Sequence, residues 1–385
     1  MDIISLDKKY IASTYNRFPV EIVRGKGSLA YDFSGKEYID MGSGIGVTAF
    51  GYCDEKWVEA VTHQLTTVQH TSNLYFTEPC ARLAELLCEK TGMKKVFFGN
   101  SGAEANECAI KAARKYSAEK KGADTNVILT LKNSFHGRTL TTLAATGQEH
   151  YHELYNPLTP GFVYAAPNIE SVIRLANENK LAGIMMECIQ GEGGVVTMPE
   201  DFVKAVAEFA HKNDIPLIID EVQTGNGRTG KMYSYMNFDI LPDIVTTAKG
   251  LGGGLPIGAC LLGEKVCDVF GFGDHGSTFG GNPAVCSGAI SVVERLTDDF
   301  LSSVRRKGEM AREILLQSSG VESVSGIGLM IGVKTKKDAA DVVKACIEKG
   351  VLCLTAKDKV RLLPALNIPD ETLMKAVKII AAAAE

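Results

Sequence analysis

An aspartate and a lysine each follow a short apolar run in the middle of the chain. The first run, Pro216–Asp220, ends on the carboxylate of Asp220, and the second, Asp243–Ala248, is followed by Lys249. Apolar runs of this length, bounded by turn residues, are typical of buried parallel strands. Ligands of open α/β sheets bind at the carboxyl ends of such strands. The sequence therefore predicts that Asp220 and Lys249 face the same crevice.

A carboxylate and an amine in one crevice suit the chemistry of pyridoxal phosphate. This cofactor bonds covalently to a lysine amine, and a carboxyl group beside its ring nitrogen keeps the ring protonated and electron-withdrawing. The lysine must lose its proton before it can attack a carbonyl carbon, and burial favours that loss. The alternative is an ordinary strand-end aspartate with a solvated lysine, and Asp220 and Lys249 alone leave both interpretations open.

The segment Asn100–Asn106 lies where a predicted strand turns into a predicted helix at 103–121. The N-terminus of a helix presents unpaired N–H groups and a positive dipole, which bind phosphate, and Gly102 allows an anion to come close. Ser101 and Glu104 also form the pattern of a capping box. The two interpretations are compatible, since a capped helix can still bind phosphate.

Further side chains could bind an aromatic ring or a carboxylate. Phe135 could stack on a planar ring, and Arg138 could bind a carboxylate through its forked guanidinium, although each type is more often structural. Arg361 stands in an apolar predicted strand, where a buried charge is costly unless an anion meets it. Glu192, in a glycine-rich segment, is a candidate for that anion.

Two competing types of site are not expected. The glycines at 250–254 lead into Pro256 and another apolar run instead of a helix, so a dinucleotide-binding site is not predicted, and the sequence has no P-loop pattern. His150 and His152 have a metal-like spacing, but no carboxylate or cysteine pattern surrounds them. We therefore expect surface histidines and no metal.

Composition narrows the function classes further. The 41 basic and 46 acidic residues give a formal net charge of -5 without a basic block, so nucleic acid is not an expected partner. The ten cysteines are scattered without a Cys-x-x-Cys pair, which is typical of reduced thiols in a cytosolic protein. No apolar stretch reaches membrane length and no secretory signal is recognisable, so we expect a soluble cytoplasmic protein without a membrane partner.

The order of the expected elements predicts the fold class. Predicted strands at 96–98, 127–131, 183–186 and 217–220 are separated by predicted helices, which include 57–67, 79–91, 103–121 and 200–213. Strands that alternate with helices indicate an α/β fold with a doubly wound, mainly parallel sheet. At 385 residues the chain has room for this large domain and a smaller one.

The two ends of the chain are predicted to form that smaller α+β domain. The N-terminal end has a predicted helix and short antiparallel strands. The C-terminal end has predicted helices at 284–296, 300–318, 337–349 and from 370, and predicted strands at 324–333, 351–354 and 360–363. We therefore expect residues 51–284 to form the large domain, inserted between residues 1–50 and 285–385.

Together these segments resemble the class III, or ω-amino, aminotransferases of the pyridoxal phosphate-dependent fold type I. The resemblance covers Tyr15 to about Ile368, and its strongest segments are Asn100–Glu107, Phe135–Thr139, Asp220–Gly230, Ala248–Ala259 and His275–Pro283. Fold type I implies a mainly parallel large domain and a smaller α+β domain built from both chain ends. Within the class, the chain is most similar to the members that act on acetylornithine.

The resemblance implies which residues contact the cofactor ring. Lys249 would bind pyridoxal phosphate covalently and move the substrate proton, while Asp220 would pair with the ring nitrogen. Gln223 would contact the phenolic oxygen of the ring. Val222 and Phe135 would lie against its two faces.

The resemblance also implies a phosphate site and a partner. The backbone of Gly102 and Ala103, assisted by Ser101, would bind the phosphate. Thr278 would reach the phosphate in the neighbouring subunit, which implies a homodimer with shared active sites. The implied cofactor site further includes His136, Glu187 and Glu221.

Two separate carboxylate sites follow from the same resemblance. Arg138 would bind the carboxylate of an acylated diamine, and Arg361 would bind the α-carboxylate of glutamate or 2-oxoglutarate. Glu192 would mask Arg361 while the other substrate is bound. Ser277 and Tyr15 would also lie near the substrate.

The implied reaction moves the distal amine of N2-acetylornithine to 2-oxoglutarate, giving N-acetylglutamate 5-semialdehyde and glutamate, in arginine biosynthesis. Ile45 favours an acylated donor, because the members specific for ornithine usually have tyrosine there. The chain departs from the usual Gly-His-x-His-Pro at Gly51–Glu55 and from a double proline at Pro364–Ala365. Succinyl-diaminopimelate, succinylornithine, ornithine and 4-aminobutyrate therefore remain alternative donors. An aminomutase is less favoured, because two arginines with a masking glutamate suit alternating substrates.

Overall fold

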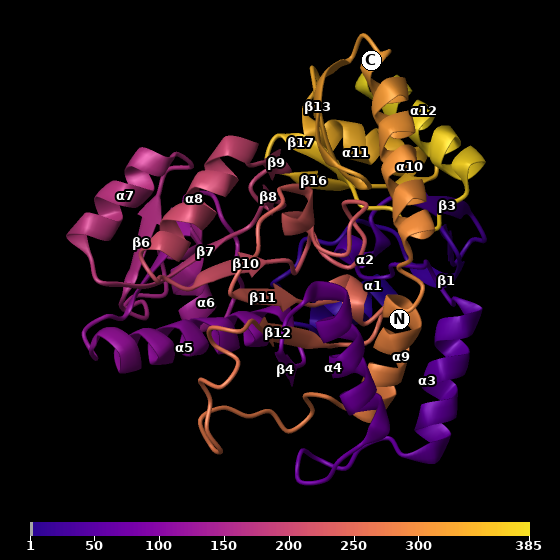
Figure 1. Ribbon diagram of the computed structural model, residues 1–385. Helices are drawn as coiled ribbons and strands as arrows, with labels where there is room; N and C mark the ends of the chain where they lie inside the picture. The colour runs from indigo at the N-terminus through magenta and orange to yellow at the C-terminus, as the bar shows by residue number, and fades with distance from the viewer. Residues whose placement is uncertain (1–2) are drawn as a thin grey trace.

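A seven-stranded sheet forms the centre of the computed structural model, which describes residues 3–385 (Figure 1). Its strands, in spatial order, are β4 (Lys95–Gly99), β12 (Gly258–Leu262), β11 (Ile244–Thr247), β10 (Leu217–Asp220), β7 (Leu181–Met186), β5 (Val127–Leu131) and β6 (Phe162–Ala165). β12 runs antiparallel to both of its neighbours, and the other adjacent pairs are parallel. The predicted mainly parallel sheet is therefore confirmed. Residues 1 and 2, the start of the predicted segment 1–50, lie outside the described residues.

Helices pack against this sheet and bury its central strands. The helices of this part of the chain are α3 (Glu55–Thr67), α4 (Glu78–Thr91), α5 (Gly102–Lys121), α6 (Leu140–Ala145), α7 (Ile169–Glu178), α8 (Glu200–Lys212) and α9 (Pro283–Val293), with the short turns η1 (Glu149–Tyr151), η2 (Ser234–Asn237) and η3 (Lys249–Leu251). α5 packs along β4, β12, β11 and β7, while α9 packs against α3 and α4. β7, β10 and β11 are buried along their whole length, as expected where helices cover a sheet. No helix within residues 3–385 is long and apolar enough to cross a membrane.

The two ends of the chain form two smaller sheets, at the top and on the right of Figure 1. One sheet contains β1 (Ile22–Lys26), β2 (Leu29–Asp32), β3 (Glu37–Asp40) and β15 (Val351–Leu352), and the other contains β13 (Val321–Ile327), β14 (Met330–Thr335), β17 (Lys359–Leu362) and β16 (Leu354–Ala356). The helices of these ends are α1 (Ile3–Tyr10), α2 (Ser43–Gly46), α10 (Asp298–Leu316), α11 (Ala339–Glu348) and α12 (Asp370–Ala384). β15 pairs in parallel with β3, so strands from both ends share one sheet. The domain boundaries at 50 and 284 stay a prediction.

Two predicted strands are wrong in detail. The predicted strand 324–333 is a hairpin of β13 and β14, which turns at Gly328, where φ is +58°. Glycine tolerates that left-handed backbone, and the surrounding apolar run concealed the turn. The predicted strand 351–354 is divided at Cys353 between β15 and β16, which belong to different sheets. β6, α7 and β12 have no counterpart among the predicted elements, because short apolar runs do not separate strands from other buried segments.

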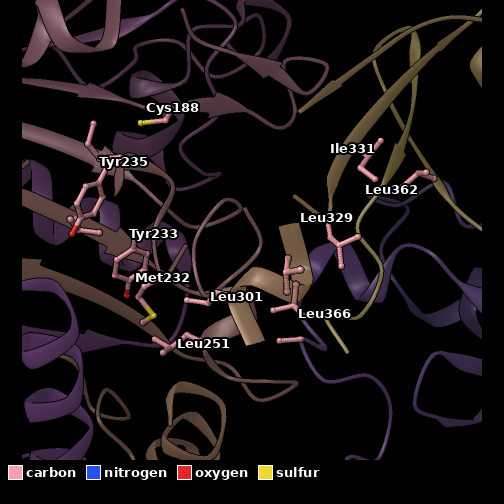
Figure 2. Packing of buried hydrophobic residues seen from close by; sticks show 14 of the residues in the cluster. Cys188, Met232, Tyr233, Tyr235, Leu251, Leu301, Leu329, Ile331, Leu362 and Leu366 are labelled. Atoms are coloured by element: carbon pink, nitrogen blue, oxygen red, sulfur yellow. The ribbon is translucent and has the colours of Figure 1, made fainter. Parts of the chain in front are cut away.

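One continuous hydrophobic core joins the central sheet to the C-terminal sheet (Figure 2). Leu251, in η3, belongs to the same buried cluster as Leu329 and Leu362. Burial of a large aliphatic side chain contributes about 1.5–3 kcal/mol. The core therefore fixes the strand that carries Arg361 relative to the turn that carries Lys249.

Candidate active site

A cavity of about 460 Å³ is lined by residues that follow β4, β5, β7, β10 and β11. The ends of parallel strands are the usual place for a ligand in an open α/β sheet. Most of the predicted site residues line this cavity together, namely Ser101, Gly102, Ala103, Phe135, His136, Arg138, Glu187, Asp220, Val222, Gln223 and Lys249. Asp220 and Lys249 thus face one crevice, as the strand ends predict.

Asp220 is held by three hydrogen-bond donors. Its Oδ2 accepts from Nδ1 of His136 at 2.8 Å and from Nδ2 of Asn106 at 2.8 Å. Its Oδ1 accepts from the backbone N–H of Val222 at 2.9 Å. An ionised carboxylate accepts about four hydrogen bonds. One accepting position therefore remains for a donor in the cavity.

Lys249 is the first residue of η3 and has a φ of +47°. Few residues other than glycine adopt this left-handed conformation, and such strain is typical of functional sites. Burial lowers the pKa of the Lys249 amine below its ordinary value, although the carboxylates of Glu192 and Asp220 oppose the shift. A lower pKa raises the share of neutral amine at neutral pH, and the neutral amine is the nucleophile.

The N-terminus of α5 presents unpaired N–H groups to the cavity. The first hydrogen bond of the helix runs from the N–H of Ala105 to the carbonyl of Ser101 at 3.1 Å. The N–H groups of Gly102 and Ala103 therefore have no partner within the helix. A Cβ atom on Gly102 would lie 2.6 Å from Val222, so this close approach requires glycine.

Ser101 caps α5 as predicted, but the reciprocal bond of the predicted capping box is shifted by one residue, because Glu104 accepts from Asn100 and not from the N–H of Ser101. The hydroxyl of Ser101 accepts from the N–H of Glu104 at 3.2 Å, and the carboxylate of Glu104 accepts from the N–H of Asn100 at 2.8 Å. The cavity thus combines an anion cradle, a carboxylate with a free accepting position and a lysine of lowered pKa. This set of groups fits pyridoxal phosphate.

Arg361, in β17, reaches a glutamate on the turn between β8 (Ile189–Gln190) and β9 (Val196–Thr197). Its Nη1 lies 2.5 Å from Oε1 of Glu192 and 3.1 Å from Oε1 of Gln223. Burial acts to raise the pKa of Glu192, but the charge of Arg361 overcomes this effect and the pKa is lowered. The ionised glutamate therefore forms an ion pair with the guanidinium, as expected for a lone arginine in an apolar strand.

Arg138 differs from Arg361 because no carboxylate forms an ion pair with it. It takes part in none of the ion pairs found within residues 3–385. Its guanidinium carbon instead lies 4.3 Å from the ring centre of Tyr151 and 5.4 Å from that of Phe135. The guanidinium of Arg138 is therefore open, meaning that it has no carboxylate partner, whereas that of Arg361 is closed by its ion pair with Glu192.

Glu221 does not reach the cavity, contrary to its expected place in the cofactor site. It is fully buried, and its carboxylate accepts hydrogen bonds from the hydroxyls of Thr224 and Ser234 and from the N–H of Tyr235. Successive residues of an extended segment point to opposite sides, so Glu221 faces away from the side on which Asp220 lies. Its contacts stabilise the following turn.

Five more expected residues do not line the cavity. Two of them, Glu192 and Arg361, contact its wall through Gln223, and the other three lie further away. Tyr15 is 71% exposed and lies beside Arg17. The Ser277 hydroxyl accepts from Nδ2 of Asn100 at 3.1 Å, which places it next to the mouth of the cavity. Thr278 is exposed and lines a different hollow of about 300 Å³. Within one chain, the structure does not bring Tyr15 or Thr278 to the site.

Asn106 contacts the site although sequence reasoning gave it no role. It is 1% exposed on α5, and its Nδ2 donates both to Asp220 and to the carbonyl of His136 at 2.7 Å. Its neighbours on the buried face include Ala105 and Ala109. A single amide among buried alanines was the available signal, because buried polar groups need hydrogen-bond partners.

Comparison with known proteins agrees with this geometry. The family model described as Aminotransferase class-III matches residues 10–384. The chain is 50% identical to the acetylornithine aminotransferase of Haemophilus ducreyi, over 98% of this chain and 96% of that protein. It is 45% identical to the acetylornithine aminotransferase of Methanocaldococcus jannaschii, over 96% of this chain and 94% of that protein.

Two solved structures extend the comparison. The N-acetylornithine aminotransferase from Stenotrophomonas maltophilia K279a is 34% identical, with a TM-score of 0.85 over 99% of this chain and 98% of that one. The ornithine aminotransferase from Toxoplasma gondii ME49 is 29% identical, with a TM-score of 0.94 over 99% of this chain and 94% of that one. The similarity therefore covers both chain ends as well as the central sheet.

Proposed function

The chain belongs to the class III aminotransferases, which depend on pyridoxal phosphate, and from this we propose that it transfers the distal amine of N2-acetylornithine to 2-oxoglutarate. The products are N-acetylglutamate 5-semialdehyde and glutamate, which places the reaction in arginine biosynthesis. Relatives at 50% and 45% identity act, by their names, on acetylornithine. The observation that carries the proposal is the pair of guanidiniums, because Arg138 is open while Glu192 closes Arg361.

When bound, pyridoxal phosphate supplies an aldehyde that holds the amino group and a ring that withdraws electrons from the reacting carbon. Asp220 keeps the ring nitrogen protonated through its remaining accepting position. Lys249, with a pKa lowered by burial, carries the proton to and from the reacting carbon. Gly102 and Ala103 would bind the phosphate through their N–H groups, and Val222, which lines the same cavity, would lie against the ring.

The two arginines assign the two substrates to different contacts. Arg138 binds the carboxylate of the acylated donor, so the distal amine reaches the cofactor. Arg361 stays paired with Glu192 in this half-reaction and exposes no competing charge. In the second half-reaction, the α-carboxylate of 2-oxoglutarate displaces Glu192 and forms the bidentate contact that guanidiniums prefer.

The proposed active unit is a homodimer with shared active sites. The loops before α4 and α9 carry large exposed apolar side chains, namely Leu74, Tyr75, Phe76, Phe272 and Phe279. Nδ2 of Asn73 joins the two loops through the carbonyls of Ser277 at 2.8 Å and Gly280 at 2.9 Å. Exposed apolar patches mark interaction surfaces, and Thr278 lies within this one. A second copy of the chain on these loops would receive Thr278 beside its own phosphate site.

We also place the enzyme in the cytoplasm, as the pattern of cysteines predicts. All ten cysteines are free thiols, and several are fully buried. Free thiols are usual in a reducing compartment.

A panel of separate half-reactions tests the proposed substrate. The cofactor-loaded enzyme is mixed with acetylornithine, succinylornithine, succinyl-diaminopimelate, ornithine or 4-aminobutyrate, and the loss of its visible absorption is followed. We expect acetylornithine to give the highest kcat/KM, and the aldehyde product to be N-acetylglutamate 5-semialdehyde. A clearly higher value for another donor would replace the proposed substrate. Conversion of one amino acid into an isomer without 2-oxoglutarate would indicate an aminomutase.

A further inference from the structure

The turn η1 places a tyrosine against the open arginine of the site. The ring centre of Tyr151 lies 4.3 Å from the guanidinium carbon of Arg138. The Phe135 ring meets Tyr151 edge-on, with ring centres 5.7 Å apart and planes at 70°, and it also lies 5.4 Å from the same guanidinium. Arg138 therefore lies against two aromatic rings that also contact each other.

An aromatic ring holds a guanidinium in a different way than a carboxylate does. It attracts the cation through its negatively charged face and uses none of the N–H donors. The forked donors of Arg138 therefore stay available to a substrate carboxylate, whereas Glu192 occupies a donor of Arg361 at 2.5 Å. Without a ring, the long Arg138 side chain would sample many rotamers before it bound a substrate.

The Tyr151 ring is itself fixed on the elements that carry Phe135. The N–H of Tyr151 donates to the carbonyl of Gln148 at 3.1 Å, and the buried side chain of Gln148 donates to the carbonyl of Ser134 at 3.1 Å. The ring of Tyr151 also contacts that of His150, with ring centres 3.9 Å apart. The turn, Phe135 and Arg138 therefore form one connected unit.

We propose that Tyr151 is a positioning residue, which holds Arg138 in the geometry that binds the carboxylate of the ω-amino donor. This role rests on the proposed function, and it makes Tyr151 a determinant of donor recognition. Since Tyr151 is only half-buried and its turn borders a second cavity of about 560 Å³, its substitution does not disturb the core.

Half-reactions of Tyr151→Leu, Tyr151→Phe and the wild type test this role. For Tyr151→Leu, we expect the acetylornithine concentration at half-maximal rate to rise about 5- to 30-fold, the effect of losing a cation–π contact. The maximal rate and the glutamate half-reaction should change little. Tyr151→Phe keeps the ring and should behave like the wild type. Tyr155→Leu, an exposed tyrosine of the same segment, is the matched control.

The Arg138→Ala background separates positioning from direct contact. If Tyr151 acts through Arg138, adding Tyr151→Leu to Arg138→Ala should cause no further loss with acetylornithine. A further loss of the same size would overturn the proposal, as would an equal loss in the glutamate half-reaction or in Tyr151→Phe. Tyr151→Met replaces Tyr151→Leu if cofactor content and far-ultraviolet circular dichroism show that the leucine variant is misfolded.

The proposed substrate can be wrong while the proposed role of Tyr151 is still right. If the panel identifies another donor that carries a carboxylate, such as 4-aminobutyrate, the same variants are compared with that donor. A preferred donor without a carboxylate would overturn both proposals.

Discussion

Nδ1 of His136 lies 2.8 Å from Oδ2 of Asp220, and both side chains are buried. Because an ionised carboxylate can only accept, Nδ1 of the histidine must donate. Nε2 of His136 is buried without a hydrogen-bond partner among the described residues. The imidazole therefore orients the carboxylate, which in the proposed function faces the ring nitrogen of the cofactor.

Replacing Asp220 with Asn should reduce turnover severely while the protein stays folded. An amide cannot stabilise a protonated ring nitrogen, and its NH₂ group would also face the donors of His136 and Asn106. Loss of such an electrostatic contact costs roughly 100-fold or more in kcat. Steady-state kinetics, with Asp201→Asn on the surface of α8 as control, measure the effect. Turnover close to that of the wild type would mean that another group faces the ring nitrogen.

The proposed role of Lys249 predicts how the covalent attachment of the cofactor depends on pH. Only the neutral amine attacks, so the rate of covalent attachment should rise with pH through the pKa of Lys249. Since burial lowers that pKa, the midpoint should lie below 10.5. Apoenzyme is mixed with pyridoxal phosphate, quenched with borohydride and digested, and the modified lysine is identified by mass. Lys249→Ala should bind the cofactor without attachment or turnover. Attachment at another lysine would contradict the assignment.

Local patterns predicted much of the site, because the key groups stand at strand ends and at a helix N-terminus. Asp220, Lys249 and Gly102 were found in this way. The link from Arg361 to Gln223 and the stack of Tyr151 on Arg138 depend on how distant segments pack. Sequence spacing carries no information about such contacts.

The same limit applies to the fold. Alternating strands and helices predicted the sheet, but the division between β15 and β16 was missed. These strands adjoin in the chain yet pair with partners in different sheets. Only tertiary packing decides which partner each strand takes.

Glu187 should make the stability of the apoenzyme depend on pH. Its pKa is raised well above the ordinary 4.5 by burial and by the charge of Asp220. Between 4.5 and the raised value, the unfolded chain has lost this proton and the folded protein has kept it. Stability from this group is therefore complete below pH 4.5 and is lost as the pH rises through the folded pKa.

The Glu187→Gln variant has no carboxyl group at this position, so it should not lose this stability as the pH rises. Its amide oxygen can still accept a hydrogen bond from the N–H of Phe135. We expect a higher Tm than that of the wild type at pH 8, with the difference shrinking towards pH 4.5. Thermal unfolding of both apoproteins, followed by circular dichroism across this range, measures it. A variant that is less stable at pH 8 would show that the native state uses the charge of Glu187.

Thr278 should act across a subunit interface. Lys249→Ala and Thr278→Ala subunits each lack one group, but a hybrid dimer combines an intact Lys249 and an intact Thr278 in one of its two sites. Random exchange should therefore restore about a quarter of wild-type activity, since half of the dimers are hybrids with one intact site. Native mass spectrometry verifies the exchange. No recovery in verified hybrids would indicate that each chain builds its phosphate site alone.

Arg361 and Glu192 should separate the two half-reactions. A guanidinium that is always open beside Lys249 would bind the α-carboxylate of the donor and present the wrong amine. In the proposed mechanism Glu192 prevents this competition by pairing with Arg361, whose Nη1 lies 2.5 Å from its Oε1, and the lowered pKa of Glu192 keeps it ionised at neutral pH. Losing a buried, bidentate charged contact costs roughly 2–5 kcal/mol, which is more than tenfold in binding.

Arg361→Ala should therefore weaken the glutamate and 2-oxoglutarate half-reaction more than tenfold and largely spare acetylornithine. Glu192→Ala should have the reverse effect, favouring glutamate and allowing donors to react through either amine. Single-turnover rates for each substrate separate these outcomes, with Glu200→Ala on the surface of α8 as control. Arg361→Lys keeps the charge without the fork and should recover only part of the glutamate reaction, because an ammonium cannot make the bidentate contact. Equal losses in both half-reactions for both alanine variants would mean that the pair only stabilises the fold, since a structural defect does not discriminate between substrates.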